Sequence, residues 1–194
     1  MNASAALALI DFWFLAPDHP GHGHYRPEWF RKDEAFDSAI RQRFGTEVEA
    51  ALGTAQNGGS DTELLARILL LDQFTRNIFR ATPRAFAGDA QALILAETLV
   101  AGGRDKNLTP WQRCFAYLPF EHSEALLNQE RSVALFAGLR REMQDGAFDG
   151  AYDYALRHRD VIARFGRFPH RNAILGREST AEEIEFLKHP GSSF

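Results

Sequence analysis

The segment of residues 151–165 would place reactive side chains on two neighbouring arcs of one helix. His158 falls in the middle of the apolar face, while Arg157, Arg164 and Arg167 fall on the adjacent arc. One interpretation makes His158 a catalytic or ligating imidazole beside guanidinium groups that hold an anion. The alternative makes it a core histidine bonded to a backbone carbonyl, with the arginines paired to acids of neighbouring helices.

A second basic segment, residues 166–177, follows with the sequence GRFPHRNAILGR. Its Pro169 suits the first turn of a short helix, where free backbone N–H groups attract anions. His170, Arg171 and Asn172 would lie beside that turn, so an anionic group could meet guanidinium and backbone donors together. Alternatively, Arg171 and Asn172 only tie neighbouring helices to each other.

Two carboxylates in the segment 119–130, Glu121 and Glu124, are spaced to share one helix face. At a helix N-terminus they would oppose the helix dipole favourably, which explains them without any function. In the alternative, Glu121, His122 or Glu124 faces the basic segment as an ion-pair partner, a metal ligand or a general acid or base. The candidate catalytic residues are therefore His158, His170, Glu121 and Glu124.

The segment 72–80, DQFTRNIFR, places polar side chains on an otherwise apolar helix. Asp72 and Arg76 are four residues apart and can form an ion pair within the helix. Alternatively, the wall of a polar pocket is formed by Gln73, Arg76, Asn77 and Arg80. With Arg76 included, the candidate ligand-binding residues are Arg76, Arg164, Arg167, Arg171, Asn172 and Arg177.

The distribution of charge favours an anionic partner. The 194 residues carry 26 acids and 22 bases, a net charge of −4, which argues against nucleic acid. Residues 157–177 nevertheless contain six arginines and two histidines against one aspartate. We expect this local basic site to recognise a small anionic molecule or an acidic peptide segment, and a protein partner also fits.

We predict no metal site and leave the cofactor unassigned. The spacing of acids and histidines matches neither HExxH nor the paired ExxH motifs of di-iron bundles. Cys114 is the only cysteine and is expected to be a buried apolar residue. The loop with His19, His22 and His24 could bind adventitious nickel or zinc, but its glycines and prolines leave its geometry undefined.

The sequence lacks the common nucleotide-binding and hydrolase motifs, and it has no recognisable signal peptide or membrane span. The chain contains no GxxxxGK[ST] loop, no GxSxG elbow and no strand–GxGxxG–helix unit. Its beginning lacks a basic segment before the apolar run, and no apolar stretch approaches the roughly 18 residues of a membrane span. We therefore expect a cytoplasmic protein that does not bind membranes.

Almost every segment has the periodicity of a helix, and none resembles a strand. The sequence predicts an all-α fold of eight or nine helices in a single domain spanning residues 1–194. The expected helices cover residues 5–15, 29–44, 47–53, 61–80, 84–101, 110–117, 120–143 and 147–165, followed by a short turn after Pro169. A last helix, capped by Ser179 or Thr180 with Glu182 or Glu183, ends before Pro190.

Five segments resemble a bacterial family labelled only as a domain of unknown function, number 924. They are DFWF, WFRKDEAFDSAIRQRFG, LLLDQFTRNIFR, LPFEHSEALLNQERSVALF, and RHRDVIARFGRFPHRNAILGREST with EEIEFLKHPGSSF. Because members look like tetratricopeptide-type superhelices, the resemblance implies helix pairs stacked in an α-α array. It implies no reaction. Thr75 stands where the family typically has proline, which would kink that helix.

Three functional hypotheses fit these patterns. In the first, a groove lined by Arg, His and Glu binds a small anion or an acidic peptide. In the second, the chain is an acid/base enzyme, with or without a metal, that uses the same side chains and needs His158 near Glu121. In the third, the polar residues only cross-link helices, and the function lies in a protein–protein surface.

Overall fold

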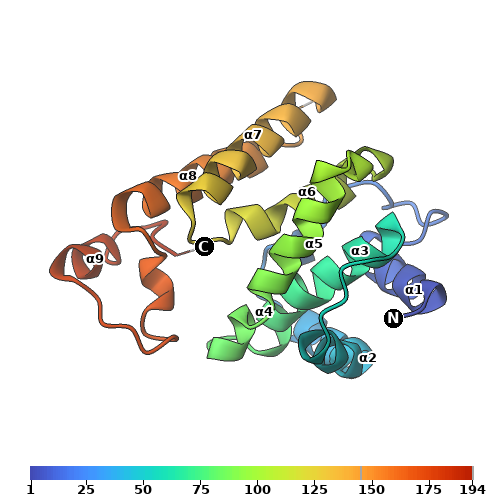
Figure 1. Cartoon of the computed structure of the whole chain (residues 1–194), viewed down its shortest axis with the longest axis horizontal. Helices are drawn as coiled ribbons and strands as arrows, with labels where there is room; N and C mark the ends of the chain where they lie inside the picture. The colour runs from blue at the N-terminus through green and yellow to red at the C-terminus, as the bar shows by residue number, and fades with distance from the viewer. Residues whose placement is uncertain (145, 194) are drawn as a thin grey trace. The chain divides into compact units, whose positions relative to one another are not determined.

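The computed structural model describes residues 1–144 and 146–193 (Figure 1). Every regular element in these ranges is helical and none is a strand, which confirms the predicted all-α class. The residues gather into two compact units: unit 1 is Met1–Arg80 with Arg84–Pro119, and unit 2 is Ala81–Pro83 with Phe120–Phe194. Within the described ranges, no helix combines the length and apolar character needed to cross a membrane. The single-domain organisation stays a prediction.

Local capping sets where the helices of unit 1 begin. Asp33 starts α2 by accepting hydrogen bonds from the N–H groups of Ala35 and Phe36. Ser60 and Glu63 start α3 with reciprocal capping bonds. The α-helices of this unit are α1 (Ala3–Phe14), α2 (Glu34–Gly53), α3 (Asp61–Ile68), α4 (Thr75–Ile78), α5 (Asp89–Ala101) and most of α6 (Pro110–Glu121).

Several predicted helix boundaries are wrong. The helix expected over residues 120–143 begins only at Leu126, so Glu121 ends α6, Glu124 lies outside a helix, and the two do not share one helix face.

Two predicted helix ends are wrong as well. A break was expected at Gly45, but α2 is continuous through it, because an interior glycine costs only about 1 kcal/mol while Phe44 and Val48 are buried on the same helix. An end was expected near Tyr117, but α6 continues through Pro119 to Glu121. Since α6 ends within one turn of Pro119, the missing N–H removes little of the helix.

The core of unit 1 is built around the buried indole of Trp13 on α1. The ring centroid of Trp13 lies 5.3 Å from that of Phe74 and 5.4 Å from that of Phe115. The backbone carbonyl of Trp13 accepts a hydrogen bond of 2.9 Å from the indole N–H of Trp29. Arg26 donates to the carbonyls of Phe12 and Trp13 as well. These donors satisfy carbonyls that the end of α1 leaves without partners in the helix.

A π-helical segment, Leu69–Phe74, joins α3 to α4 and was not predicted. Such segments widen the helix and carry one residue more per turn. The hydroxyl of Thr75 donates to the carbonyl of Leu71 at 2.7 Å. The backbone of Gly88 packs directly on the same turn, since a Cβ atom added there would lie 2.3 Å from the Leu71 carbonyl oxygen.

Gly88→Ala is therefore expected to lower the free energy of unfolding by about 1–3 kcal/mol, the range for overpacking. The atoms that the added Cβ would meet belong to the backbone of Leu71, so no side-chain rotation relieves the contact. Urea denaturation followed by tryptophan fluorescence measures the change, because all three tryptophans lie in unit 1. Gly45→Ala is the matched control, since a Cβ there meets nothing within 4 Å. Equal stabilities of the two variants would contradict the tight packing.

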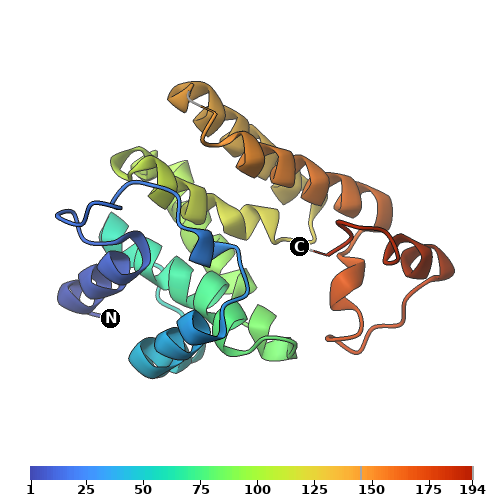
Figure 2. The ribbon, with the colours of Figure 1, turned by 180° about the vertical axis from the view of Figure 1, so that it is seen from behind.

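Unit 2 is dominated by two neighbouring helices, α7 (Leu126–Met143) and α8 (Asp149–Phe165), which lie side by side in both ribbon views (Figures 1 and 2). Gly166, with φ of 70°, ends α8 in a left-handed conformation that suits glycine. A 3-10 turn at Pro169–Arg171 and the short helix α9 (Ala181–Phe186) follow. Thr180 and Glu183 start α9 with the capping pattern that the sequence predicts.

Candidate functional site

The imidazole of His158 is buried in unit 2, on the face of α8 that the sequence predicts to be apolar. Its Nδ1 atom lies 2.8 Å from the carbonyl oxygen of Tyr154, one turn earlier in the helix. A carboxylate oxygen of Glu121, at the end of α6, lies 3.4 Å from the same nitrogen. Because Nδ1–H donates to the carbonyl, we assign the lone pair of the neutral ring to Nε2.

Burial keeps His158 neutral. Loss of solvent is the largest cause and repulsion from His122, Arg171 and His170 adds to it, so that together they lower its pKa from 6.5 to about 3. The hydrogen bond to Tyr154 opposes this shift without reversing it. His158 therefore carries no charge at neutral pH.

The ring of Phe168 contacts His158, His170 and Arg171. Phe168 has no exposed surface, and its ring centroid lies 5.5 Å from that of His158 and 5.6 Å from that of His170. The guanidinium carbon of Arg171 lies 4.4 Å from the same centroid. The rings of His122 and His158 are 6.3 Å apart. We call this group the histidine cluster; it consists of Glu121, His122, His158, Phe168, His170 and Arg171.

An arginine network lies next to the histidine cluster in the chain and holds the 3-10 turn to α9. Arg167 donates two hydrogen bonds, of 2.6 and 2.8 Å, to the carboxylate of Glu183. Arg177 binds Glu124 in the same bidentate manner, at 2.7 and 2.9 Å. Asn172 links the two pairs, because it donates to Glu183 at 3.3 Å and accepts from Arg177 at 3.0 Å.

The pKa values of both network carboxylates reflect this pairing. The hydrogen bonds from Arg167 lower the pKa of Glu183 to about 2. For Glu124, burial alone would raise the pKa, but hydrogen bonds from Arg177 and from the backbone N–H of Phe168 bring it below its usual range. Arg164 pairs with Glu182 at 2.8 Å on the exposed side of unit 2. The candidates Arg164, Arg167 and Arg177 are thus held by carboxylates of unit 2.

Arg76 lies in unit 1 and is held there by two carboxylates. It binds Asp89 through two hydrogen bonds, of 2.8 and 3.0 Å, and lies 3.5 Å from a carboxylate oxygen of Asp72. Burial alone would lower the pKa of Arg76, but the two acids raise it above its ordinary value. Gln73 donates to Asp72 at 2.6 Å, and Asn77 donates to Asp37 at 2.7 Å.

The histidines of the loop after α1 bond to the loop itself. Nδ1 of His22 contacts the carbonyl of Leu15 at 2.7 Å, and Nδ1 of His19 accepts from the backbone N–H of Gly21 at 3.0 Å. His24 contacts the carbonyl of His22. In residues 1–144 and 146–193, no three His, Cys, Asp or Glu side chains converge as metal ligands would.

Sequence reasoning missed the roles of Phe168 and Glu183. Phe168 stands between two predicted site residues, but nothing in the sequence says that its ring contacts a histidine on α8. Glu183 was recognised as a helix cap, whereas its ion pair with Arg167 spans 16 residues of chain and has no local spacing signal. Phe168 and Arg167 directly precede the 3-10 turn at Pro169–Arg171, and Pro169 predicts that turn.

Comparison with known proteins shows a family and one similar structure. The family model described as "Bacterial protein of unknown function (DUF924)" matches residues 9–191. A solved structure of a protein of unknown function from Agrobacterium tumefaciens is 36% identical, with a TM-score of 0.73, covering 96% of this chain and 98% of that one. No curated protein matches the chain.

Proposed function

The chain belongs to the bacterial family of unknown function DUF924, and we propose that it is a binding protein for a small anionic ligand. We place the ligand at the histidine cluster of unit 2. The observation that carries this proposal is the gathering of one guanidinium and two imidazoles, from Arg171, His122 and His170, around the neutral ring of His158. An anion bound there would meet the charged guanidinium of Arg171 and N–H donors of the two imidazoles, while the carboxylate of Glu121 lies on the Nδ1 side of His158.

The accessibility of the cluster supports the proposal. Arg171 and His158 are buried, whereas His122 and His170 are partly exposed and reach the surface of unit 2. An anion at the two outer imidazoles would neutralise part of the positive field that lowers the pKa of His158. Guanidinium and imidazole N–H groups supply the charge-assisted hydrogen bonds that hold carboxylates and phosphates.

We assign the arginine network a positioning role. Glu124 accepts from the backbone N–H of Phe168 at 2.8 Å, and Arg177 donates to the carbonyl of the same residue at 3.1 Å. Both backbone groups of Phe168 are therefore fixed by side chains of the network. This holds the ring on which Arg171 and His170 rest. Arg76 lies in unit 1, and we assign it no contact with this ligand.

Calorimetric titration with inorganic phosphate and with citrate, in a buffer free of both, tests the proposal. We expect Arg171→Gln to weaken binding about tenfold or more, the loss of one charge-assisted hydrogen bond. His170→Asn, at a partly exposed position, gives the same test with less risk to folding. Arg157→Gln is the matched control, because Arg157 forms an exposed pair with Asp153 on α8. Equal affinities for the control and both cluster variants would refute the proposal.

An acid/base enzyme is the second candidate, favoured by the 3.4 Å between His158 Nδ1 and Glu121. A carboxylate beside one ring nitrogen can orient an imidazole whose other nitrogen takes up a proton. A pKa of about 3 makes His158 a weak base, so this function needs a ligand that raises the pKa towards neutrality. NMR titration of His158 with saturating phosphate measures that shift, and an unchanged pKa would exclude the second candidate.

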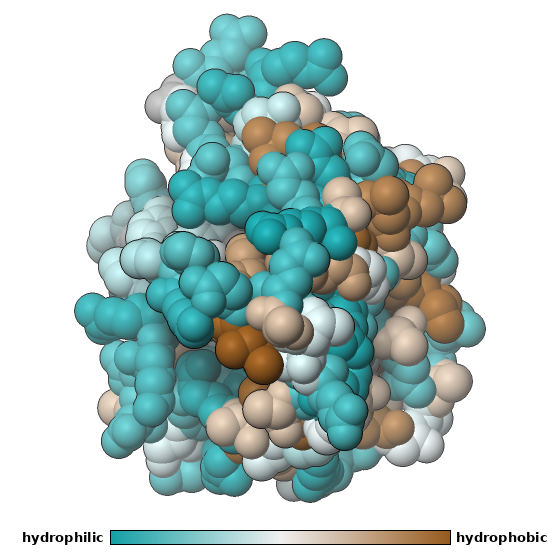
Figure 3. All heavy atoms as spheres, turned by 90° about the vertical axis from the view of Figure 1, so that its left-hand side faces the viewer, coloured by the Kyte–Doolittle hydropathy of each residue, from teal (hydrophilic) through white to brown (hydrophobic). Residues whose placement is uncertain are grey.

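Three expectations from the sequence remain proposals: the stacking of the helices, the cellular location and a protein-interaction surface. The tetratricopeptide-like stacking is supported in part by the adjacent pair α7 and α8. A cytoplasmic location rests on the sequence. A protein-interaction surface receives little support from the face shown in Figure 3, where hydrophobic side chains form small separate groups among hydrophilic ones.

A further inference from the structure

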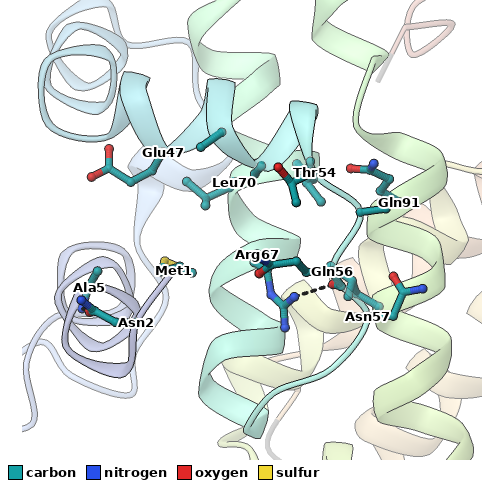
Figure 4. A pocket seen from close by; sticks show the side chains of 15 residues that line it. Met1, Asn2, Ala5, Glu47, Thr54, Gln56, Asn57, Arg67, Leu70 and Gln91 are labelled. Carbon is teal, nitrogen blue, oxygen red and sulfur yellow. Dashed lines mark hydrogen bonds between the residues drawn. The ribbon is translucent and has the colours of Figure 1, made fainter.

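Unit 1 contains a cavity of about 310 Å³, formed by the start of α1, the end of α2 with the loop after it, α3, the π-helical segment and α5 (Figure 4). This volume lies at the lower end of the range for small-molecule sites. None of the candidate residues from the sequence lines it. The cavity is therefore a candidate binding site separate from the histidine cluster.

The buried charged group of the cavity wall is the guanidinium of Arg67, a residue only 7% exposed. Its Nε–H donates to the carbonyl of Glu63 at 3.2 Å, and its terminal nitrogens donate to the carbonyls of Gln56 and Gly58. All three acceptors are neutral. Among the described residues, no carboxylate forms an ion pair with Arg67, unlike Arg76 of the same unit.

In the ranges that the structure describes, this environment leaves the guanidinium of Arg67 with no carboxylate at ion-pair distance, the nearest acidic influence being the charge of Glu63. Burial lowers the pKa of Arg67, and the charge of Glu63 offsets only part of that shift. A guanidinium has five N–H donors, and the three hydrogen bonds to carbonyls use three of them. A buried cation held by neutral acceptors gains most from an anion that completes its hydrogen bonds.

The other residues that line the cavity limit which anions could bind beside Arg67. Figure 4 shows Thr54, Asn57 and Gln91 on one side of Arg67, where their side chains supply polar contacts. Glu47 lies on the other side, beyond Leu70. The apolar part of the wall comes from the π-helical segment, α5, α1 and the alanines at the end of α2.

We propose that this cavity binds a small organic monocarboxylate, with the carboxylate on Arg67 and an apolar body against the π-helical segment. The carboxylate would supply the direct ion-pair partner that Arg67 lacks among the described residues. The apolar body would cover Leu70 and its neighbours. Glu47 disfavours a second negative charge at the far end of the ligand, so a dicarboxylate of the same length is excluded.

Ligand-observed NMR and calorimetry with hexanoate as the probe test the proposal, with adipate and hexylamine as matched analogues. We expect the native chain to bind hexanoate at least about tenfold more tightly than either analogue, from one charge-assisted contact. Comparable affinity for hexylamine, or no saturable binding of hexanoate, would overturn the proposal.

Two variants locate the site. Arg67→Gln removes the charge but also disturbs the loop that Arg67 holds, so Ala51→Leu is the second variant, which fills the cavity and leaves Arg67 in place. Each is expected to weaken hexanoate binding about tenfold or more. Ala35→Leu, exposed on the same helix α2, is the control and should bind as the native chain does. Unchanged binding by Ala51→Leu would overturn the proposal.

The two proposed sites can fail independently. Arg171→Gln in unit 2 should leave hexanoate binding unchanged, and Ala51→Leu in unit 1 should leave phosphate binding unchanged. Loss of hexanoate binding in Arg171→Gln would place that ligand at the histidine cluster instead and overturn the assignment to unit 1.

Discussion

Replacing Phe168 with alanine is expected to lower the free energy of unfolding of the protein by about 3–5 kcal/mol, the usual loss for a buried aromatic side chain. Phe168 has no exposed surface and belongs to the apolar core of unit 2 with Val161 and Ile162. Its ring also contacts His158, His170 and Arg171. The variant therefore leaves a cavity and removes the surface on which the cationic side chains of the cluster rest.

Urea denaturation followed by far-UV circular dichroism measures this loss, because unit 2 contains no tryptophan. Hydrogen exchange of the α8 amides shows whether the loss lies in unit 2. Tyr154→Ala is the matched control on the same helix, since Tyr154 is 50% exposed and its loss should cost about 0.5 kcal/mol. A Phe168→Ala variant no less stable than this control would show that the ring does not organise the cluster.

Acidification is expected to lower the free energy of unfolding through His158, by about 2–3 kcal/mol between pH 6.5 and pH 4.5. The folded pKa of His158 is about 3 and its ordinary value is 6.5. Between these values the unfolded chain takes up a proton that the folded chain does not, so stability falls as pH falls. The groups that face His158 are Glu121, His122, His170 and Arg171, and the last three oppose its protonation.

Urea denaturation of the native chain and of His158→Gln at several pH values tests this account. Glutamine keeps a donor for the Tyr154 carbonyl and has no proton to gain, so its stability should depend less on pH. The window above pH 4.5 separates His158 from Glu183, whose pKa of about 2 makes its ion pair fail only in stronger acid. The control is His189→Gln at an exposed position. Parallel pH curves for the native chain and His158→Gln would contradict a neutral buried imidazole.

The helical class could be predicted from the sequence because apolar periodicity and capping residues act locally. The Thr180–Glu183 cap and the turn at Pro169 are examples that the structure contains. The π-helical segment could not be predicted, since its residues have the apolar periodicity of an ordinary α-helix, and the close approach of the Gly88 backbone to Leu71 is a tertiary contact with no local sequence signal. The continuity of α2 through Gly45 similarly depends on tertiary burial, which outweighs the low helix propensity of glycine.

The site could be predicted only in part, for the same reason. Periodicity placed His158 on an apolar face, and its bond to the Tyr154 carbonyl is the one that the core-histidine interpretation describes. The partners of Arg167 and Arg177 are acids 16 and 53 residues away. Long-range pairs of this kind leave no spacing signal in a single sequence. The sequence also does not show that Arg67 is buried with backbone carbonyls as its hydrogen-bond acceptors, because burial depends on the tertiary fold.

The most direct test of anion binding at the histidine cluster is a phosphate titration observed through the imidazole resonances of the seven histidines. We predict saturable shifts for His122, His158 and His170, with His19, His22, His24 and His189 unmoved as internal references. The same shifts should persist in Arg157→Gln and be lost in Arg171→Gln. Shifts that do not saturate, or that appear equally in the reference histidines, would contradict a phosphate or carboxylate site in unit 2.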